Sequence, residues 1–361
     1  MRHDYPLMNF SQFLPSFRKD ELLDFGLYQT PLIKTSKEFC DYIGVKSCYL
    51  KMETQLPTKT MKDRITELMF SQFKKQGIKH YALASTGNTA ASLAWGMEKY
   101  DDVFSATVFI SSEQLEYHTF KKPKNMRTVL LENATYDQAF LYAQRYSTSL
   151  LKSVEKDAMI FLRYQAGKIS YLEAFFQAQR ENLKLDLVCQ SVSAGVGIIG
   201  ADKAIQDCLS IQMFDRYPKI IIGQPSYANP IVSCYNSGRE QYDHQFTIMQ
   251  PKKSLAWPIR RGNGEATFGI IKEILDKSNG FAFSASEEKI ALAKAKLYEI
   301  EGINAGHASC VVIAGLNTNK FKCDFSCDTC LIMLTGQDRN DVDIVEIDQI
   351  MKESEWKKIG F

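Results

Sequence analysis

Short apolar runs alternate along the chain with longer stretches whose apolar positions recur every three or four residues. The short runs have the length and composition of buried strands, and they cover residues 47–52, 80–84, 106–110, 128–131, 185–190, 219–223 and 329–334. The periodic stretches predict helices over residues 62–76, 89–100, 136–151, 170–183, 195–211, 265–277 and 287–300. Strands that alternate with helices need crossover connections, which give mostly parallel sheets covered on both faces. The pattern therefore predicts an α/β fold.

Two stretches interrupt this alternation. Residues 147–157 are polar and charged, so we expect the chain to cross there from an N-terminal part, residues 1–155, to a C-terminal part, residues 156–361. Residues 224–263 contain several prolines and few periodic runs, which indicates an irregular surface of the kind that forms active-site walls. The sequence has no internal repeat, and this argues against a solenoid.

Composition narrows the class of protein. The 361 residues are 45% hydrophobic and 24% charged, and 44 basic residues against 42 acidic ones leave a net charge of +2. This balance gives no electrostatic reason to expect nucleic acid or an anionic membrane as a partner. No run approaches the roughly 20 apolar residues that span a bilayer, and the first residues mix charge with proline where a signal peptide would be apolar. We therefore expect a cytoplasmic protein.

The cysteines admit two interpretations. Nine cysteines, several of them in strand-like runs, favour reduced thiols over a disulfide framework. The spacing of Cys323, Cys327 and Cys330, with His307 as a fourth candidate ligand, is open to a zinc interpretation. However, Cys330 belongs to a predicted strand and the chain has no second paired cysteine unit, so structural cysteines are favoured and no metal is expected.

Lys62 stands where the predicted helix 62–76 begins. Pro57 precedes it, and Thr58 and Thr60 are residue types that cap helices. The start of a helix favours anions, so an ammonium group there is better explained if the amine becomes neutral or meets an anion. On these residues alone, a solvated lysine remains the simpler interpretation.

Two small-residue loops follow predicted strands. The run Ala84–Gly87 precedes Asn88 and the helix after it, and the run Ser191–Gly200 leads into the helix 195–211. A strand, a loop of small residues and a helix start together make a general anion site, because backbone amides without partners converge there. Either loop alone could equally be an ordinary capped helix.

Together these segments resemble the pyridoxal-phosphate enzymes of fold type II, the tryptophan synthase β-like group, and threonine synthase in particular. The resemblance is carried by Pro57-Thr58-Lys59-Thr60-Met61-Lys62-Asp63-Arg64 and by Ser85-Thr86-Gly87-Asn88-Thr89-Ala90-Ala91-Ser92, and it extends from about Thr30 to Gly336. It implies two three-layer α/β/α domains with mostly parallel sheets, and pyridoxal 5′-phosphate in the cleft between them.

The resemblance also implies roles for single residues. Lys62 would form the Schiff base with the cofactor and then act as base, and Asn88 would contact the cofactor's phenolic oxygen. Thr335, at the end of an apolar strand, would bond the pyridine nitrogen. The substrate carboxylate would be held by Ser85, Thr86, Asn88 and Thr89. The cofactor phosphate would be held by Ser193, Ala194, Gly195, Val196 and Gly197.

Several positions depart from the family pattern. Lys59, Ser193 and Val196 stand where glycine is usual, and Gly306-His307 replaces an acid and a proline. Gln337-Asp338-Arg339-Asn340 follows Gly336, where threonine synthases commonly have histidine, glycine, leucine and lysine. These departures leave three hypotheses open for function.

The first hypothesis is a threonine synthase-like enzyme that acts on O-phosphohomoserine. The second is β-elimination or β-replacement on a serine-type substrate, as in cysteine synthase or a specialised biosynthetic pathway. The third is a non-catalytic relative that binds a ligand without turnover. Under the first two, the expected partner is a small amino acid, and a homodimer is compatible with the family.

Overall fold

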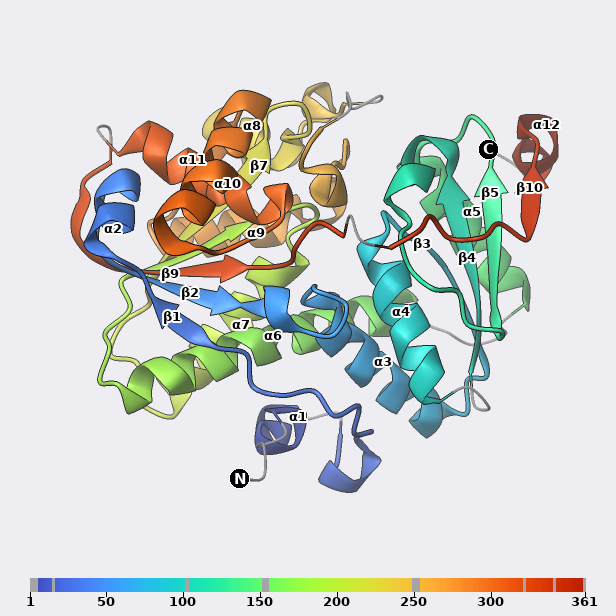
Figure 1. Ribbon diagram of the computed structural model, residues 1–361, viewed down its shortest axis with the longest axis horizontal. Coiled ribbons are helices and arrows are strands. Elements are labelled where there is room, and N and C mark those ends of the chain that lie inside the picture. Colours follow the sequence, from blue (N-terminus) through green and yellow to red (C-terminus); the bar gives the residue numbers. More distant parts are fainter. Residues whose placement is uncertain are drawn as a thin grey trace. The chain divides into compact units, whose positions relative to one another are not determined.

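The structure is a computed structural model, and it describes residues 6–14, 17–100, 104–150, 156–248, 254–320, 323–339 and 342–359. The chain divides into two compact units (Figure 1). Unit 1 comprises Met1–Pro15, Tyr28–Met61 and Tyr164–Asp338, and unit 2 comprises Ser16–Leu27, Lys62–Arg163 and Arg339–Phe361. The parts expected from the sequence, 1–155 and 156–361, each contain segments of both units.

Unit 1 is built on a sheet that has six strands among its described residues, in the order β1-β2-β9-β6-β7-β8. β1 runs antiparallel to β2, and the other neighbours are parallel. The strands are β1 (Leu32–Lys34), β2 (Val45–Met52), β6 (Leu187–Ser191), β7 (Lys219–Pro225), β8 (Phe281–Ala285) and β9 (Phe325–Leu334). The central strands are largely apolar and buried, because helices shield both of their faces from water.

The helices of unit 1 cover this sheet. Figure 1 shows α2, α10 and α11 on one side of the sheet and α6 and α7 on the other. The helices are α1 (Pro6–Asn9), α2 (Lys37–Ile43), α7 (Val196–Ser210), α8 (Pro230–Asn236), α9 (Glu265–Lys277), α10 (Glu287–Glu301) and α11 (His307–Asn319). The long helix α6 (Lys156–Arg180) begins in unit 2 and ends in unit 1. Short 3₁₀ turns of this unit are η1 (Ser11–Phe13), η3 (Glu53–Gln55), η5 (His244–Phe246) and η6 (Trp257–Ile259).

Unit 2 has a smaller sheet, with the order β10-β5-β4-β3 and parallel pairing between all described neighbours. Its elements are α3 (Lys62–Gln76), β3 (His80–Ala84), α4 (Asn88–Lys99), β4 (Ser105–Ser111), β5 (Met126–Leu131), α5 (Tyr136–Leu150), β10 (Gln349–Met351) and α12 (Glu353–Trp356), with the turns η2 (Lys19–Glu21), η4 (Ser112–Tyr117) and η7 (Lys357–Ile359). Trp356 is fully buried, and its indole N–H donates to the Glu132 carbonyl at 2.9 Å. This contact fastens the C-terminal segment to the sheet.

The predicted α/β class with mostly parallel sheets is confirmed. The expected crossing at 147–157 is partly helical, because α5 extends to Leu150 and α6 already begins at Lys156; residues 151–155 lie outside the described residues. The irregular stretch 224–263 contains α8, which the sequence pattern did not predict.

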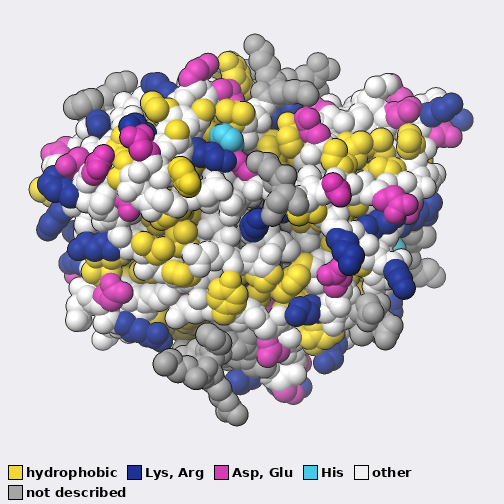
Figure 2. Space-filling model, in the orientation of Figure 1, with side chains coloured by type: hydrophobic (Ala, Val, Ile, Leu, Met, Phe, Trp, Pro, Cys, Tyr) yellow, Lys and Arg dark blue, Asp and Glu magenta, His cyan; other side chains and the backbone are white. Residues whose placement is uncertain are grey.

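The face of the molecule seen in Figure 2 mixes both signs of charge. Acidic and basic side chains are interspersed across it, as the balanced composition leads one to expect. No helix within the described ranges is long and apolar enough to cross a membrane.

Candidate functional site

The segment that leads to Lys62 has an unusual backbone conformation at Lys59. Its φ is +59°, in the left-handed region that glycine adopts without strain and other residues adopt at a cost. This conformation explains why glycine is usual at this position in the family that the sequence resembles. The Lys59 carbonyl accepts a hydrogen bond from the Gln337 amide at 2.9 Å. A Cβ atom on Gly336 would lie 3.0 Å from that carbonyl oxygen, so a side chain there would crowd the close approach of the two segments.

The same segment is hydrogen-bonded to the end of β9. The Met61 amide donates to the Thr335 carbonyl at 2.9 Å, and Thr60 forms an antiparallel bridge with Gly336. Lys62 is the next residue of the chain and opens α3. Two segments that the sequence reasoning singled out separately, at Pro57–Met61 and at Thr335, are therefore joined within unit 1.

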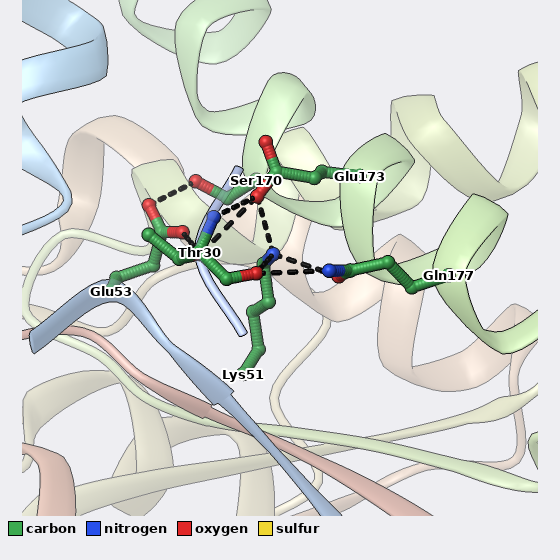
Figure 3. A network of polar contacts seen from close by, with 6 residues as sticks. All are labelled: Thr30, Lys51, Glu53, Ser170, Glu173 and Gln177. Carbon is green, nitrogen blue, oxygen red and sulfur yellow. Dashed lines mark hydrogen bonds and ion pairs between the residues drawn. The ribbon is translucent and has the colours of Figure 1, made fainter. Parts of the chain in front are cut away.

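A buried polar network holds the start of this segment (Figure 3). The Lys51 ammonium pairs with Glu173 and donates to the Thr30 carbonyl at 2.6 Å and to Gln177 Oε1 at 2.9 Å. Glu53, which opens η3, accepts from the Thr30 hydroxyl at 2.7 Å and from the Ser170 hydroxyl at 2.8 Å. These contacts fix the end of β2 against α6, and the chain continues from there toward Lys62.

The Lys62 amine lies in an environment that disfavours its charge. Lys62 is only partly exposed, and loss of solvation together with the positive charge of Arg163 lowers the pKa of its ammonium to about 8. A substantial fraction of these amines is thus neutral near pH 8, and a neutral amine is the form that attacks a carbonyl or accepts a proton. The expectation that this lysine is easily neutralised agrees with the electrostatics.

The loop before α4 is shaped by its own serine. The Ser85 hydroxyl oxygen is buried and accepts from the Gly87 amide at 2.9 Å and the Ala90 amide at 3.0 Å. Gly87 has a φ of +116°, which a residue with a side chain rarely adopts. Thr86, Asn88 and Thr89 are partly exposed. Ser85 therefore shapes the turn, and the other three predicted carboxylate ligands remain accessible on unit 2.

Asn88 has a partner that the sequence reasoning missed. Its Oδ1 accepts a hydrogen bond from Arg339 Nη1 at 2.7 Å. Arg339 is almost completely buried, and its Nε donates to the Thr119 carbonyl at 3.3 Å. Arg339 lies in the stretch after Gly336 that departs from the threonine synthase pattern. The unusual residues after Gly336 were the signal in the sequence that could have drawn attention to Arg339. Nothing in the sequence indicated that Arg339 contacts Asn88.

The loop before α7 has the features of an anion site. Gly195 adopts φ +76°, and a Cβ there would come within 2.2 Å of Ile271 Cδ1. A Cβ on Gly197 would come within 2.3 Å of the Gln190 side chain. The first amides of a helix have no intrahelical partner, and the hydrogen bonds of the described residues satisfy none of the amides of residues 193–197. Ser193, Ala194 and Val196 are partly exposed, so these amides can bind an external anion.

Thr335 lies beside the start of α11. Ser309 Oγ is 3.4 Å from Thr335 Oγ1, donates to the Gly336 carbonyl at 2.8 Å and accepts from the Gly336 amide at 3.1 Å. The serine on α11 thus holds the backbone next to the predicted pyridine ligand.

Two of the departing residues meet near this point. The His307 Nδ1 and Asp338 Oδ2 atoms are 2.8 Å apart, and Lys294 Nζ lies 2.5 Å from the same oxygen. Burial raises the pKa of Asp338, but the hydrogen bonds from His307 and Lys294 outweigh this and keep it below its ordinary value. Gly306 lies close to this pair, because a Cβ there would come within 3.0 Å of Asp338 Oδ1.

The cysteine cluster does not converge. Cys327 is exposed on β9, whereas Cys330 is buried with its sulfur 3.4 Å from that of Cys189. His307 is engaged with Asp338. In the part of the chain that the structure describes, no group of three or more His, Cys, Asp or Glu side chains is arranged to hold a metal ion.

Comparison with known proteins agrees with the resemblance seen in the sequence. The family model described as "Pyridoxal-phosphate dependent enzyme" matches residues 23–336. The threonine synthase of Methanosarcina acetivorans is 26% identical over 314 residues, which are 85% of this chain and 73% of that protein. The threonine synthase of Halalkalibacterium halodurans is 24% identical over 319 residues, covering 86% of this chain and 82% of that protein.

Solved structures share the fold at lower identity. The diaminopropionate ammonia lyase of Escherichia coli superposes with a TM-score of 0.68 at 15% identity, covering 92% of this chain and 88% of that chain. Maize serine racemase gives a TM-score of 0.65 at 15% identity, with 87% and 91% covered. The threonine deaminase of Solanum lycopersicum, isoform 2, gives 0.65 at 16% identity, with 93% and 90% covered. These likenesses confirm the predicted fold type and leave the reaction open.

Proposed function

Because the chain belongs to the pyridoxal-phosphate dependent enzyme family, we propose that it is a threonine synthase-like enzyme that converts O-phosphohomoserine into threonine and phosphate. The observation that carries the proposal is the environment of Lys62, a partly buried lysine whose pKa is lowered to about 8. The two relatives named threonine synthase support the choice of substrate class.

The residues present fit the cofactor. The amides of residues 193–197 lack partners among the described residues and suit a phosphate, and a side chain at Gly195 or Gly197 would collide with Ile271 or Gln190. Lys62 supplies the amine, Asn88 an amide for the phenolic oxygen, and Thr335 a hydroxyl for the ring nitrogen. When bound, pyridoxal phosphate withdraws electrons from the substrate's Cα, so that the Cα proton is acidified and a leaving group further along the substrate can depart.

The side chains of this protein would then have separate roles in the reaction. Lys62 would hold the cofactor and, as a free amine, would accept the proton from the substrate's Cα; its lowered pKa keeps part of the amine neutral near pH 8. Thr86, Asn88 and Thr89 orient the substrate carboxylate at the start of α4. Thr335 would offer a neutral hydroxyl to the ring nitrogen, a partner that suits elimination and replacement chemistry.

A second candidate is β-elimination or β-replacement on a serine-type substrate. It is favoured by the stretch Gln337–Arg339, which departs from the threonine synthase pattern and carries the His307–Asp338 and Asn88–Arg339 contacts. Different side chains next to Thr335 and Asn88 would change which substrate the enzyme accepts.

The test is an absorbance spectrum of the purified protein with pyridoxal phosphate, before and after borohydride, beside a Lys62→Ala variant. A visible band near ~410–420 nm that borohydride abolishes, and that the variant lacks, is expected for a lysine–cofactor linkage. Phosphate release is then measured with O-phosphohomoserine and with O-phosphoserine. Release from the first alone supports the proposal, release from the second alone supports the second candidate, and a protein that binds no cofactor contradicts both.

A further inference from the structure

We propose that Arg339 is a positioning residue for Asn88: its guanidinium fixes the side-chain amide so that the NH₂ group is presented to the cofactor's phenolic oxygen. This inference rests on the cofactor part of the proposed function and not on the identity of the substrate. It assigns a role to the stretch after Gly336, which the proposed function leaves unexplained.

The contacts all lie within unit 2. Arg339 Nη1 donates to Asn88 Oδ1 at 2.7 Å, a short distance typical of a hydrogen bond from a charged donor. The arginine is itself held on a second side, because its Nε donates to the Thr119 carbonyl and its own carbonyl accepts from the Thr119 hydroxyl at 3.2 Å. A side chain that is 8% exposed and bonded in this way has little freedom to leave Asn88.

The chemistry of the two side chains decides the orientation. A guanidinium carries only donors, and an asparagine amide carries one acceptor oxygen and one donor NH₂. Because Arg339 engages the oxygen, the amide cannot flip, and the NH₂ group is directed away from the arginine. A phenolic oxygen that carries negative charge needs such a donor. The positive charge of Arg339 also polarises the amide, which strengthens that donor.

The surrounding charges favour this arrangement. His118, beside Arg339, is fully buried; burial is the main cause that lowers its pKa to about 4, and the charge of Arg339 lowers it further. His118 is therefore neutral at physiological pH and does not compete as a cation for Asn88. Arg163 is a further cation of this unit, and its charge acts on Lys62.

The experiment is a double-mutant cycle on cofactor affinity. Pyridoxal phosphate is titrated by fluorescence into the wild type, Arg339→Gln, Asn88→Ala and the double variant. Each single variant is expected to weaken binding about tenfold, the effect of one hydrogen bond to a charged group. The double variant should be no weaker than Asn88→Ala, because Arg339 acts through Asn88. Arg339→Lys, which keeps the charge and one donor direction, should recover part of the affinity.

A spectroscopic readout separates positioning from simple stability. The pH dependence of the visible band is compared between the wild type and Arg339→Gln, where loss of the positive charge should move the midpoint upward by about one pH unit. Arg127→Gln is the matched control, since Arg127 is an exposed arginine of the same unit that bonds Gln349. It should leave both the affinity and the band unchanged.

Three outcomes would overturn the inference. One is a folded Arg339→Gln with wild-type affinity and an unaltered band; another is a full additional loss when Arg339→Gln is added to Asn88→Ala. If Arg339→Gln does not fold, Asn88→Asp decides, because the carboxylate keeps the contact with Arg339 but removes the NH₂ donor. Unchanged affinity in Asn88→Asp is the third outcome.

The same measurements separate this inference from the proposed function. A wild type that binds the cofactor but does not react with O-phosphohomoserine contradicts the proposed function alone, and a wild type that binds no cofactor contradicts both.

Discussion

Lys51 and Lys62 lie on the same stretch of chain and are both withdrawn from water, yet their surroundings are opposite. Lys51 is fully buried and meets Glu173 and the oxygen atoms of Thr30 and Gln177. At Lys62, loss of solvation and, to a lesser extent, the positive charge of Arg163 lower the pKa of the ammonium. Burial alone therefore does not make a lysine reactive. What differs is that the carboxylate of Glu173 compensates the ammonium of Lys51, whereas loss of solvation, assisted by the charge of Arg163, disfavours the ammonium of Lys62.

The largest effect should come from exchanging each lysine for methionine. Lys62→Met is expected to lower turnover roughly 10³-fold or more, because nucleophile and base are lost together. Lys51→Met should keep the borohydride-sensitive band in whatever fraction folds. The spectra of the two variants, normalised to folded protein, provide the comparison. A band that survives in Lys62→Met and disappears in Lys51→Met would reverse the assignment of the two lysines.

The free energy of unfolding should respond in the opposite order, with a larger loss on replacing Lys51 than on replacing Lys62. Lys51→Ala leaves Glu173 as a buried charge without its ammonium, and we expect a loss of about 3–5 kcal/mol in the free energy of unfolding. Adding Glu173→Gln should recover much of this loss, since the amide can still accept from Thr30 but carries no charge. Urea unfolding of the single and double variants measures both values. A double variant less stable than Lys51→Ala would contradict the ion-pair explanation.

The third prediction concerns pH and the cofactor-free protein. Lowering the Lys62 pKa from 10.5 to about 8 favours the neutral amine in the folded state, so the charged form costs stability at low pH. The cost is complete below about pH 8 and disappears as pH rises toward 10.5. Lys62→Met should therefore be more stable than the wild type at pH 7, by about 1–3 kcal/mol after allowance for partial exposure.

This difference should shrink between pH 8 and pH 10.5 and vanish above it. Thermal or urea unfolding of the cofactor-free proteins across that range measures it. A difference that stays constant with pH would assign it to packing instead of titration.

The smallest effect should follow from removing the cation beside Lys62. Loss of solvation is the main cause of its lowered pKa and Arg163 the lesser one. Arg163→Gln should therefore raise that pKa by less than about one pH unit. The pH dependence of the rate of linkage to pyridoxal phosphate reports it. The control is Arg180→Gln, which changes an exposed arginine at the end of the same helix. An equal shift of the Lys62 pKa in this variant would assign the effect to surface charge in general and not to Arg163.

The comparison also shows what the sequence could predict. Helices 62–76 and 265–277 and strand 80–84 match the structure at both ends, because their periodicity is strong and clear breaks bound them. β8 and β10 were missed: Phe281–Ala285 and Gln349–Met351 each pair with one strand among the described residues, and Gln349–Met351 has little burial. Such strands are specified by their neighbours in the sheet more than by their own residues.

The turns of the candidate site were predictable where backbone geometry leaves a mark in the sequence. Gly87 and Gly195 have positive φ, and Lys59 adopts the conformation expected of the glycine it replaces. The contacts of Arg339 and of the Lys51 network join residues far apart in the chain. No local pattern encodes such pairs. From the sequence alone, Lys51 therefore looked like an ordinary strand residue, and Arg339 looked like a departure from the family pattern without a role.

The unequal burial of the thiols of unit 1 makes one of them available for selective labelling. Cys48, Cys189, Cys208, Cys310 and Cys330 are buried, and burial raises the pKa of Cys208 and of Cys310 to about 12, whereas Cys327 is exposed on β9. A maleimide dye or a mercury compound should therefore react first at Cys327 in the native protein. That gives a fluorescent reporter or a heavy-atom derivative on unit 1 without any engineered cysteine.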